Sequence, residues 1–127
     1  MATIELTADT FDDLVTRNDI VVIDFWAEWC GPCKAFGPVF EAASEKHDGV
    51  VFAKVDTEEQ QALAQAFQVR SIPMLMVFRE KVILYSQPGA LPPEALDNII
   101  EQVKGIDMAK VHEEVAKQQT AQAGPEN

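Results

Sequence analysis

The stretch IVVIDFWAEWCGPCK, from Ile20 to Lys34, joins a run of strand-forming residues to a pair of cysteines. Its first half is β-branched and aromatic with almost no alternation of polar and apolar side chains, which is typical of a central strand covered on both faces. An acid, Asp24, stands inside this apolar run, and Cys30 and Cys33 follow it with Gly-Pro between them. Two things need explaining: the task of the two thiols, and the presence of an acid in a strand that is expected to be buried.

The sequence around this stretch predicts an alternation of strands and helices. Apolar runs predict strands at residues 3–6, 20–27, 50–56, 73–79 and 82–87. Helical spacing of apolar residues predicts inward faces at Phe11, Leu14 and Val15; at Phe36, Val39, Phe40 and Ala43; at Leu63, Ala66 and Phe67; and at Leu96, Ile99, Ile100 and Val103. Only Glu80 and Lys81 separate the last two strands, so these strands must be antiparallel neighbours. The order βαβαβα followed by ββα indicates an α/β fold, with a central mixed sheet flanked by helices on both faces.

Composition limits the classes of function. The 127 residues carry 21 acidic and 10 basic side chains, which give a formal net charge of −11. This excess repels phosphate backbones and anionic lipid, so neither nucleic acid nor a membrane surface is an expected partner. No stretch approaches the roughly 18 apolar residues of a membrane span, and the first residues lack the basic segment and apolar core of a secretory signal. We therefore expect a cytoplasmic protein, in a compartment where thiols are normally kept reduced.

The end of the chain differs from the rest in its pattern. Gly105 is expected to end the last core helix, which gives a main domain at residues 1–105. Asp107 can cap a further amphipathic helix with three apolar side chains on one side: Met108, Val111 and Val115. From Lys117 onward the sequence has no apolar residue larger than alanine, which is typical of disorder. Residues 106–127 are therefore predicted to form an extension, a short amphipathic helix followed by a disordered tail.

Three roles are open to the cysteine pair: a metal clip, a structural disulfide and a redox centre. A zinc site needs about four Cys, His or acidic ligands, usually as two paired sets. This chain has one cysteine pair, and its two histidines, His47 and His112, lie far apart in sequence and are expected on solvated helix surfaces. No metal is therefore expected. Permanent disulfides seldom persist in the cytosol, which leaves redox chemistry as the preferred interpretation.

The position of Cys30 supports that interpretation. It follows a strand and precedes a helix, so its sulfur lies where unpaired N–H groups and the helix dipole favour an anion. The thiolate is the attacking species in thiol–disulfide exchange. Cys33 lies one helical turn further on, close enough to close a small disulfide ring, and Pro32 suits the first position of a helix. Cys30 is thus expected to attack a disulfide, and Cys33 to resolve the mixed disulfide that forms.

These residues resemble the active-site segment of the thioredoxin family. The resemblance extends over about residues 3–105, and its motifs are Asp24 in the strand, the sequence Trp-Cys-Gly-Pro-Cys from Trp29, Ile72-Pro73 before a strand, and Gly89 after the hairpin. It implies the thioredoxin fold and a protein-disulfide reductase that needs no bound cofactor, because the electrons reside on its own cysteines. It also implies disulfide-containing client proteins, and a flavin- and NADPH-dependent thioredoxin reductase as the electron donor. The Gly-Pro pair resembles that of the reducing members.

The resemblance also implies roles for individual residues. Pro73 should follow a cis peptide bond and face Cys30, with the backbone of Ile72 pairing with the substrate chain. Trp29 should cover the attacking sulfur and present an apolar surface. A shallow groove around Cys30 should be formed by Gly31, Pro32, Ile72 and Gly89. Met74, where the family usually has threonine, and Pro88 depart from the pattern and alter the shape of this groove.

Asp24 and Lys54 are expected in adjacent strands, with two interpretations. In the first they form a structural ion pair; in the second, burial raises the pKa of Asp24 so that it takes a proton from Cys33. Two alternatives to the reductase also stay open at this point. One is an oxidant or isomerase on the same fold, which differs in redox potential rather than in motif. The other is a binding module whose partners recognise the groove or the extension without thiol exchange.

Overall fold

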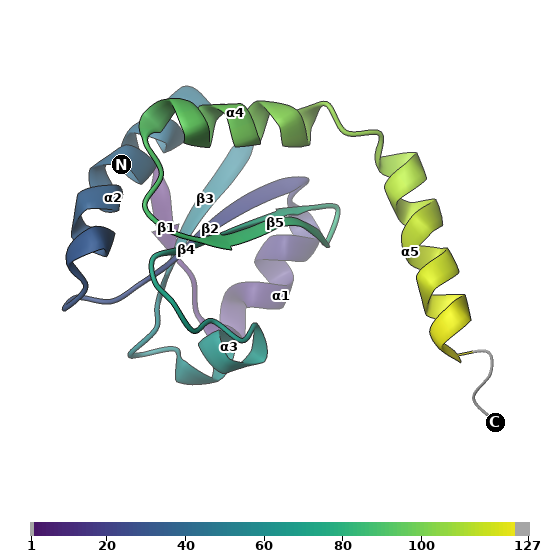
Figure 1. Cartoon of the computed structure of the whole chain (residues 1–127), viewed down its shortest axis with the longest axis horizontal. Helices are drawn as coiled ribbons and strands as arrows, with labels where there is room; N and C mark the ends of the chain where they lie inside the picture. Colours follow the sequence, from purple (N-terminus) through teal and green to yellow (C-terminus); the bar gives the residue numbers. More distant parts are fainter. Residues whose placement is uncertain (1, 124–127) are drawn as a thin grey trace.

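The computed structural model describes residues 2–123, and side chains up to residue 119. Its elements in chain order are β1 (Thr3–Glu5), α1 (Ala8–Arg17), β2 (Ile20–Trp26), α2 (Gly31–Lys46), β3 (Val50–Asp56), α3 (Gln61–Ala66), β4 (Met74–Arg79), β5 (Val82–Pro88), α4 (Pro93–Lys104) and α5 (Met108–Ala123). The strands form one sheet in the order β1-β3-β2-β4-β5, with helices on both of its faces (Figure 1). The α/β class and the mixed sheet are as the sequence predicts.

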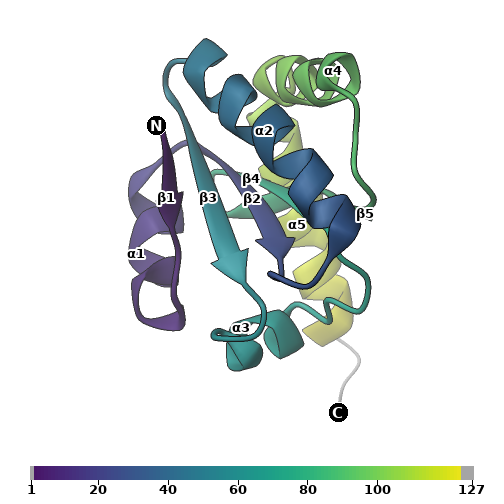
Figure 2. The same ribbon diagram turned by 90° about the vertical axis from the view of Figure 1, so that its left-hand side faces the viewer.

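Strand β2 occupies the centre of the sheet. It pairs in parallel with β3 and antiparallel with β4, and all but its last residue are buried. Figure 2 shows β2 between β3 and β4, with α2 lying across this part of the sheet. Because β2 is covered on both faces, it can be apolar throughout, which explains why its sequence does not alternate.

The core lies in two layers, one on each face of the sheet. Alternate residues of β2 enter different layers, because successive side chains of a strand point to opposite faces. Val22 packs with Phe36, Phe40 and Ile100 of α2 and α4. Val21 and Ile23 pack on the other face, against α1 and α3, with these residues among others: Val15, Leu63, Met76 and Phe78. The two layers hold the carboxyl end of β2, and the cysteines that follow it, in a fixed place.

Two details of the core and hairpin differ from the sequence predictions or sharpen them. Ala66 is exposed, and Ala64 is buried in its place, so the inward face of α3 is turned by part of a helical turn. The turn between β4 and β5 has a positive φ at both Glu80 (51°) and Lys81 (71°). Two-residue hairpin loops of type I′ need positive φ at both positions, which is why glycine or asparagine is usual there.

The prediction for the histidines is wrong for His47, which is only 7% exposed. The last turn of α2 packs beside α4, and that helix supplies partners for both ring nitrogens: Asp97 Oδ1 lies 2.9 Å from Nε2, and Lys104 Nζ lies 3.4 Å from Nδ1. His112 is half exposed, as expected, and its Nε2 lies 2.6 Å from Glu80 Oε1. Apolar periodicity alone does not show which neighbouring element a polar side chain will meet.

The extension is more ordered than the sequence predicts. Its helix begins after Asp107, whose carboxylate accepts the backbone N–H of Ala109 (3.1 Å), and continues to Ala123 rather than ending near Lys117. The rest of the predicted tail, residues 124–127, lies outside the described residues. Met108 is buried, so α5 starts in contact with the domain. Figure 1 shows α5 beyond the β4–β5 turn, on the side of the sheet away from α2. Within residues 2–123 no helix combines the length and apolar character that a membrane crossing needs.

Candidate functional site

The two cysteines lie where β2 ends and α2 begins. Cys30 is the N-cap of α2, and its Sγ accepts the backbone N–H of Cys33 at 3.2 Å. The two residues form a disulfide, with their Cα atoms 5.2 Å apart. Each is only 4% exposed. The sulfur of Cys30 therefore lies at the helix N-terminus, where N–H groups and the helix dipole stabilise a thiolate once the disulfide is reduced.

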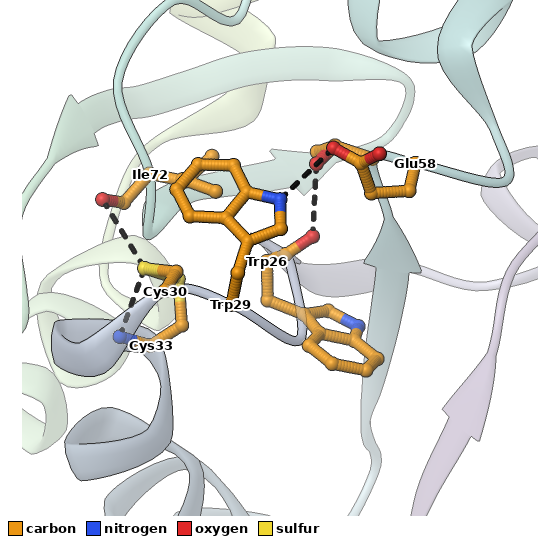
Figure 3. The surroundings of a disulfide bond; sticks show 7 residues. Trp26, Trp29, Cys30, Cys33, Glu58 and Ile72 are labelled. Atoms are coloured by element: carbon orange, nitrogen blue, oxygen red, sulfur yellow. Dashed lines mark hydrogen bonds between the residues drawn. A yellow bond between two sulfur atoms is a disulfide. The ribbon is translucent and has the colours of Figure 1, made fainter.

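A second segment, distant in sequence, faces the disulfide. The Ile72-Pro73 peptide bond is cis, as predicted. The carbonyl oxygen of Ile72 lies 3.7 Å from Cys30 Sγ, and Figure 3 shows this carbonyl directed at the sulfur. The backbone N–H of Gly89 donates to the Pro73 carbonyl (2.8 Å), with φ at Gly89 of +121°, a conformation that favours glycine. The start of β4 and the end of β5 thus form one wall beside Cys30.

The predicted groove residues come together around the disulfide but differ in exposure. Gly31 and Pro32 are exposed at the start of α2, and Ile72 is half-buried against the cysteines. Gly89 is exposed beside Pro73. A Cβ added at Gly31 or at Gly89 would meet no atom within 4 Å, so both positions face open space. The surface next to the buried sulfurs is consequently shallow and open to an incoming chain.

Among the described residues, Trp29 is the most exposed large apolar side chain, at 68%. Its Nε1–H donates to Glu58 Oε2 (3.0 Å), and Figure 3 shows the indole between Cys30 and that carboxylate. Thr57, beside Glu58, donates through both its N–H (2.9 Å) and its hydroxyl (3.0 Å) to the carbonyl of Trp26. Sequence reasoning missed Glu58 and Thr57. Both residues follow β3. Because β3 is parallel to β2, the carboxyl end of β3 reaches the same edge of the sheet as the cysteines. This topology is the signal that could have identified Glu58 and Thr57.

Asp24 is fully buried, and neither of its carboxylate oxygens has a hydrogen-bond partner among the described residues. Burial raises the pKa of Asp24 from 3.8 to about 7, and the positive charge of Lys54 offsets part of that rise. Lys54 is the residue opposite Asp24 in the register of β2 with β3. Its Nζ lies over the ring of Trp26, 4.9 Å from the centroid, and no ion pair within 4.0 Å joins it to Asp24 in the part of the chain described. The two residues are neighbours, and Asp24 is left without a direct partner.

This arrangement offers chemistry through sulfur and a proton acceptor rather than through a metal. Among residues 2–123 no group of three or more His, Cys, Asp or Glu side chains is placed to hold a metal ion. What the site provides is a reversible dithiol, an exposed aromatic side chain beside it, and a buried carboxyl whose pKa is near neutral. Such a set can exchange disulfides with another molecule.

Comparisons with known proteins agree with this chemistry. The family profile described as Thioredoxin matches residues 2–102. A relative in Streptomyces coelicolor, named Putative thioredoxin 2, is 58% identical over 123 residues, which are 97% of this chain and 91% of that protein. Thioredoxin C-3 of Corynebacterium nephridii is 41% identical over 100 residues, 78% of this chain and 69% of the other. Among solved structures, a mutant thioredoxin of Halobacterium salinarum NRC-1 aligns with a TM-score of 0.77 at 36% identity, covering 83% of this chain and 93% of its own.

Proposed function

This chain belongs to the thioredoxin family and is a thiol-disulfide oxidoreductase that reduces protein disulfides through the Cys30–Cys33 pair, and from this premise we propose how its residues divide the reaction. In the reduced protein the Cys30 thiolate attacks one sulfur of a client disulfide. The new bond is a mixed disulfide, and the other client sulfur leaves as a thiolate that takes up a proton. Cys33 then attacks Cys30, releases the second client thiol and closes the Cys30–Cys33 disulfide, so that two electrons pass to the client.

The position of Cys30 at the N-cap of α2 is the observation that carries this assignment. Its Sγ already accepts the Cys33 N–H, a bond that strengthens when the acceptor is an anion. Cys33 lies within the first turn and lacks that N-cap position. The helix terminus therefore favours the thiolate at Cys30 over the thiolate at Cys33.

Asp24 is the proposed acceptor of the Cys33 proton. A carboxyl with a pKa of about 7 is present in both protonation states near neutral pH, as a proton acceptor that must later release the proton requires. Lys54 tunes that pKa downward by its charge. Both roles rest on burial and on the register of the strands, and no cofactor takes part.

The client is proposed to lie on the shallow surface around the disulfide. Trp29 offers an apolar contact, and Gly31 and Pro32 leave room at the start of α2. The Ile72 backbone, with Pro73 and Gly89 beside it, would pair with the client chain. A flavin- and NADPH-dependent thioredoxin reductase is the proposed electron donor. The cytoplasm is the proposed location, since a dithiol reductant works where the glutathione pool is reducing.

Single cysteine variants test these roles. Cys30→Ser should abolish reduction of insulin disulfides, because the attacking thiolate is gone. Cys33→Ser should instead accumulate a mixed disulfide through Cys30, visible as a higher-mass species that dithiothreitol removes. Limited alkylation of the reduced wild type, followed by peptide mapping, should label Cys30 first. Earlier labelling of Cys33, or mixed disulfides formed by the Cys30→Ser variant, would reverse the assignment.

A further inference from the structure

The side chain of Trp29 has one polar anchor. It is 68% exposed, yet it lies directly next to a sulfur that is almost completely covered. A client that reaches Cys30 must therefore contact Trp29. The described residues give the indole a single hydrogen bond, from Nε1–H to Glu58 Oε2 at 3.0 Å. Because most of the ring is exposed, this bond is the polar contact, among those described, that can favour one rotamer of the indole.

The anchor itself is held in place by the backbone. The N–H of Glu58 donates to Asp56 Oδ1 (2.9 Å), which fixes the turn that follows β3. Thr57 fastens the same turn to the Trp26 carbonyl through its N–H and its hydroxyl. Figure 3 shows the two connections side by side, one to Trp26 and one to Trp29. The turn after β3 is thus hydrogen-bonded both to the last residue of β2, Trp26, and to Trp29 in the loop between β2 and α2.

We infer that Glu58 is a positioning residue for protein substrates, acting through Trp29. Its carboxylate holds the indole in the orientation that a client chain meets, although Glu58 forms no hydrogen bond to either cysteine among the described contacts. Without the bond the exposed indole would sample several rotamers, and client binding would have to order it at an entropic cost. The effect should therefore fall on client affinity more than on sulfur chemistry.

Comparing a protein substrate with a small disulfide distinguishes a positioning role of Glu58 from a general structural role. A protein disulfide must lie across Trp29, whereas a small neutral disulfide such as 2-hydroxyethyl disulfide can reach Cys30 with little contact to the indole. The inference rests on the proposed function, in which Cys30 is the attacking sulfur. The small disulfide tests that assignment separately, because its reduction requires Cys30 and does not require Glu58.

Three variants in the turn make the test. Glu58→Ala removes the acceptor, Glu58→Gln removes the charge but keeps an acceptor oxygen, and Glu59→Ala changes the neighbouring exposed acid, whose side chain forms no hydrogen bond among the described contacts. The readouts are kcat and KM for insulin reduction, the rate with 2-hydroxyethyl disulfide, and the indole N–H resonance of Trp29, assigned with a Trp26→Phe variant.

Glu58→Ala should raise KM for insulin roughly two- to tenfold, the factor to which the net contribution of one hydrogen bond corresponds. Its kcat and its rate with the small disulfide should stay as in wild type, and the Trp29 resonance should move. Glu58→Gln and Glu59→Ala should resemble wild type in KM. The inference is overturned if Glu58→Ala matches Glu59→Ala in KM and leaves the resonance unchanged, or if it slows both substrates equally. Small-disulfide reduction by a Cys30→Ser variant would instead refute the proposed role of Cys30.

Discussion

Besides the two cysteines, two titratable side chains are buried among the described residues, and their surroundings differ: His47 has hydrogen-bond partners and Asp24 has none. His47 joins the end of α2 to α4, and both of its ring nitrogens have a partner: Asp97 Oδ1 at 2.9 Å and Lys104 Nζ at 3.4 Å. Its ring also stacks over Phe52, with the ring centroids 6.3 Å apart. Asp24, in the central strand, is fully buried, and neither of its oxygens has a partner among the described residues.

The pKa shifts of the nearby acids follow from that difference. Hydrogen bonds from Lys46 and His47 hold the pKa of Asp97 below 3.8, so the ionised form of Asp97 is favoured in the folded protein. Burial raises the pKa of Asp24 to about 7, so its ionised form is disfavoured. A partnered polar cluster can add to stability, whereas an unpartnered carboxyl costs stability. An unpartnered carboxyl in the strand that leads to the redox disulfide is consistent with the role proposed for Asp24, whereas the cluster around His47 joins two helices.

The largest expected effect comes from Asp24→Asn. Below about pH 4 the folded and unfolded forms of wild type both bind the proton, and the penalty for burying the charge is absent. The penalty grows as the pH rises from 3.8 and is complete above the folded pKa of about 7, where the shift corresponds to roughly 4 kcal/mol. Asp24→Asn should therefore be more stable than wild type at pH 9, by up to that amount less the cost of an unpartnered amide. Urea midpoints of the oxidised proteins at pH 5 and pH 9 measure the widening gap.

The same variant should be slower as a reductase, by roughly tenfold or more at pH 7, because the proposed acceptor of the Cys33 proton is gone. Asp97→Asn, which removes a partner of the buried His47, is the matched control. Its loss of stability should be present near neutral pH and should disappear as the pH falls below 3.8, with reduction rates unchanged. An ion pair between Asp24 and Lys54 would predict a less stable Asp24→Asn at pH 9. That result, with an unaltered rate, would make Asp24 a structural residue like those around His47.

The sequence was sufficient for the features that depend on local pattern. The run of apolar residues placed β2 in the centre of the sheet, and the position of Cys30 between a predicted strand and a predicted helix placed its sulfur at a helix N-terminus. It was insufficient where a side chain's partner comes from a distant segment. His47 looked solvated because Asp97 lies fifty residues further along the chain. Glu58 was missed because its bond to Trp29 depends on how the ends of β2 and β3 meet.

The extension lies at the end of the molecule away from the disulfide, so its removal should lower stability without affecting catalysis. Ending the chain after Gly105 removes buried Met108, the Ile106 carbonyl that accepts from Arg79 Nη1 (3.2 Å), and the contact of His112 with Glu80. We expect the free energy of unfolding to fall by about 2–3 kcal/mol, because truncation removes one buried methionine and one hydrogen bond. This decrease is larger than the loss of three weakly buried apolar residues would give. Insulin reduction should be unchanged. Urea unfolding and the insulin assay on the same preparations measure both, and a folded but inactive truncated protein would assign α5 a part in the reaction.

The smallest effect is expected at the turn that α5 contacts. Lys81 has a φ of 71°, a left-handed conformation that costs a residue with a Cβ atom roughly 1 kcal/mol. Lys81→Gly removes this cost, and the greater freedom of glycine in the unfolded chain offsets part of the gain, so stability should rise by about 0.5 kcal/mol. Glu80 is kept because it contacts His112. Lys81→Ala is the control, since it removes the lysine side chain and keeps the strained φ, and it should bring no gain. Equal urea midpoints for the glycine and alanine variants would show that the backbone at Lys81 carries no strain. Reduction rates should stay equal in all three proteins, because this turn and the disulfide lie at opposite ends of β4.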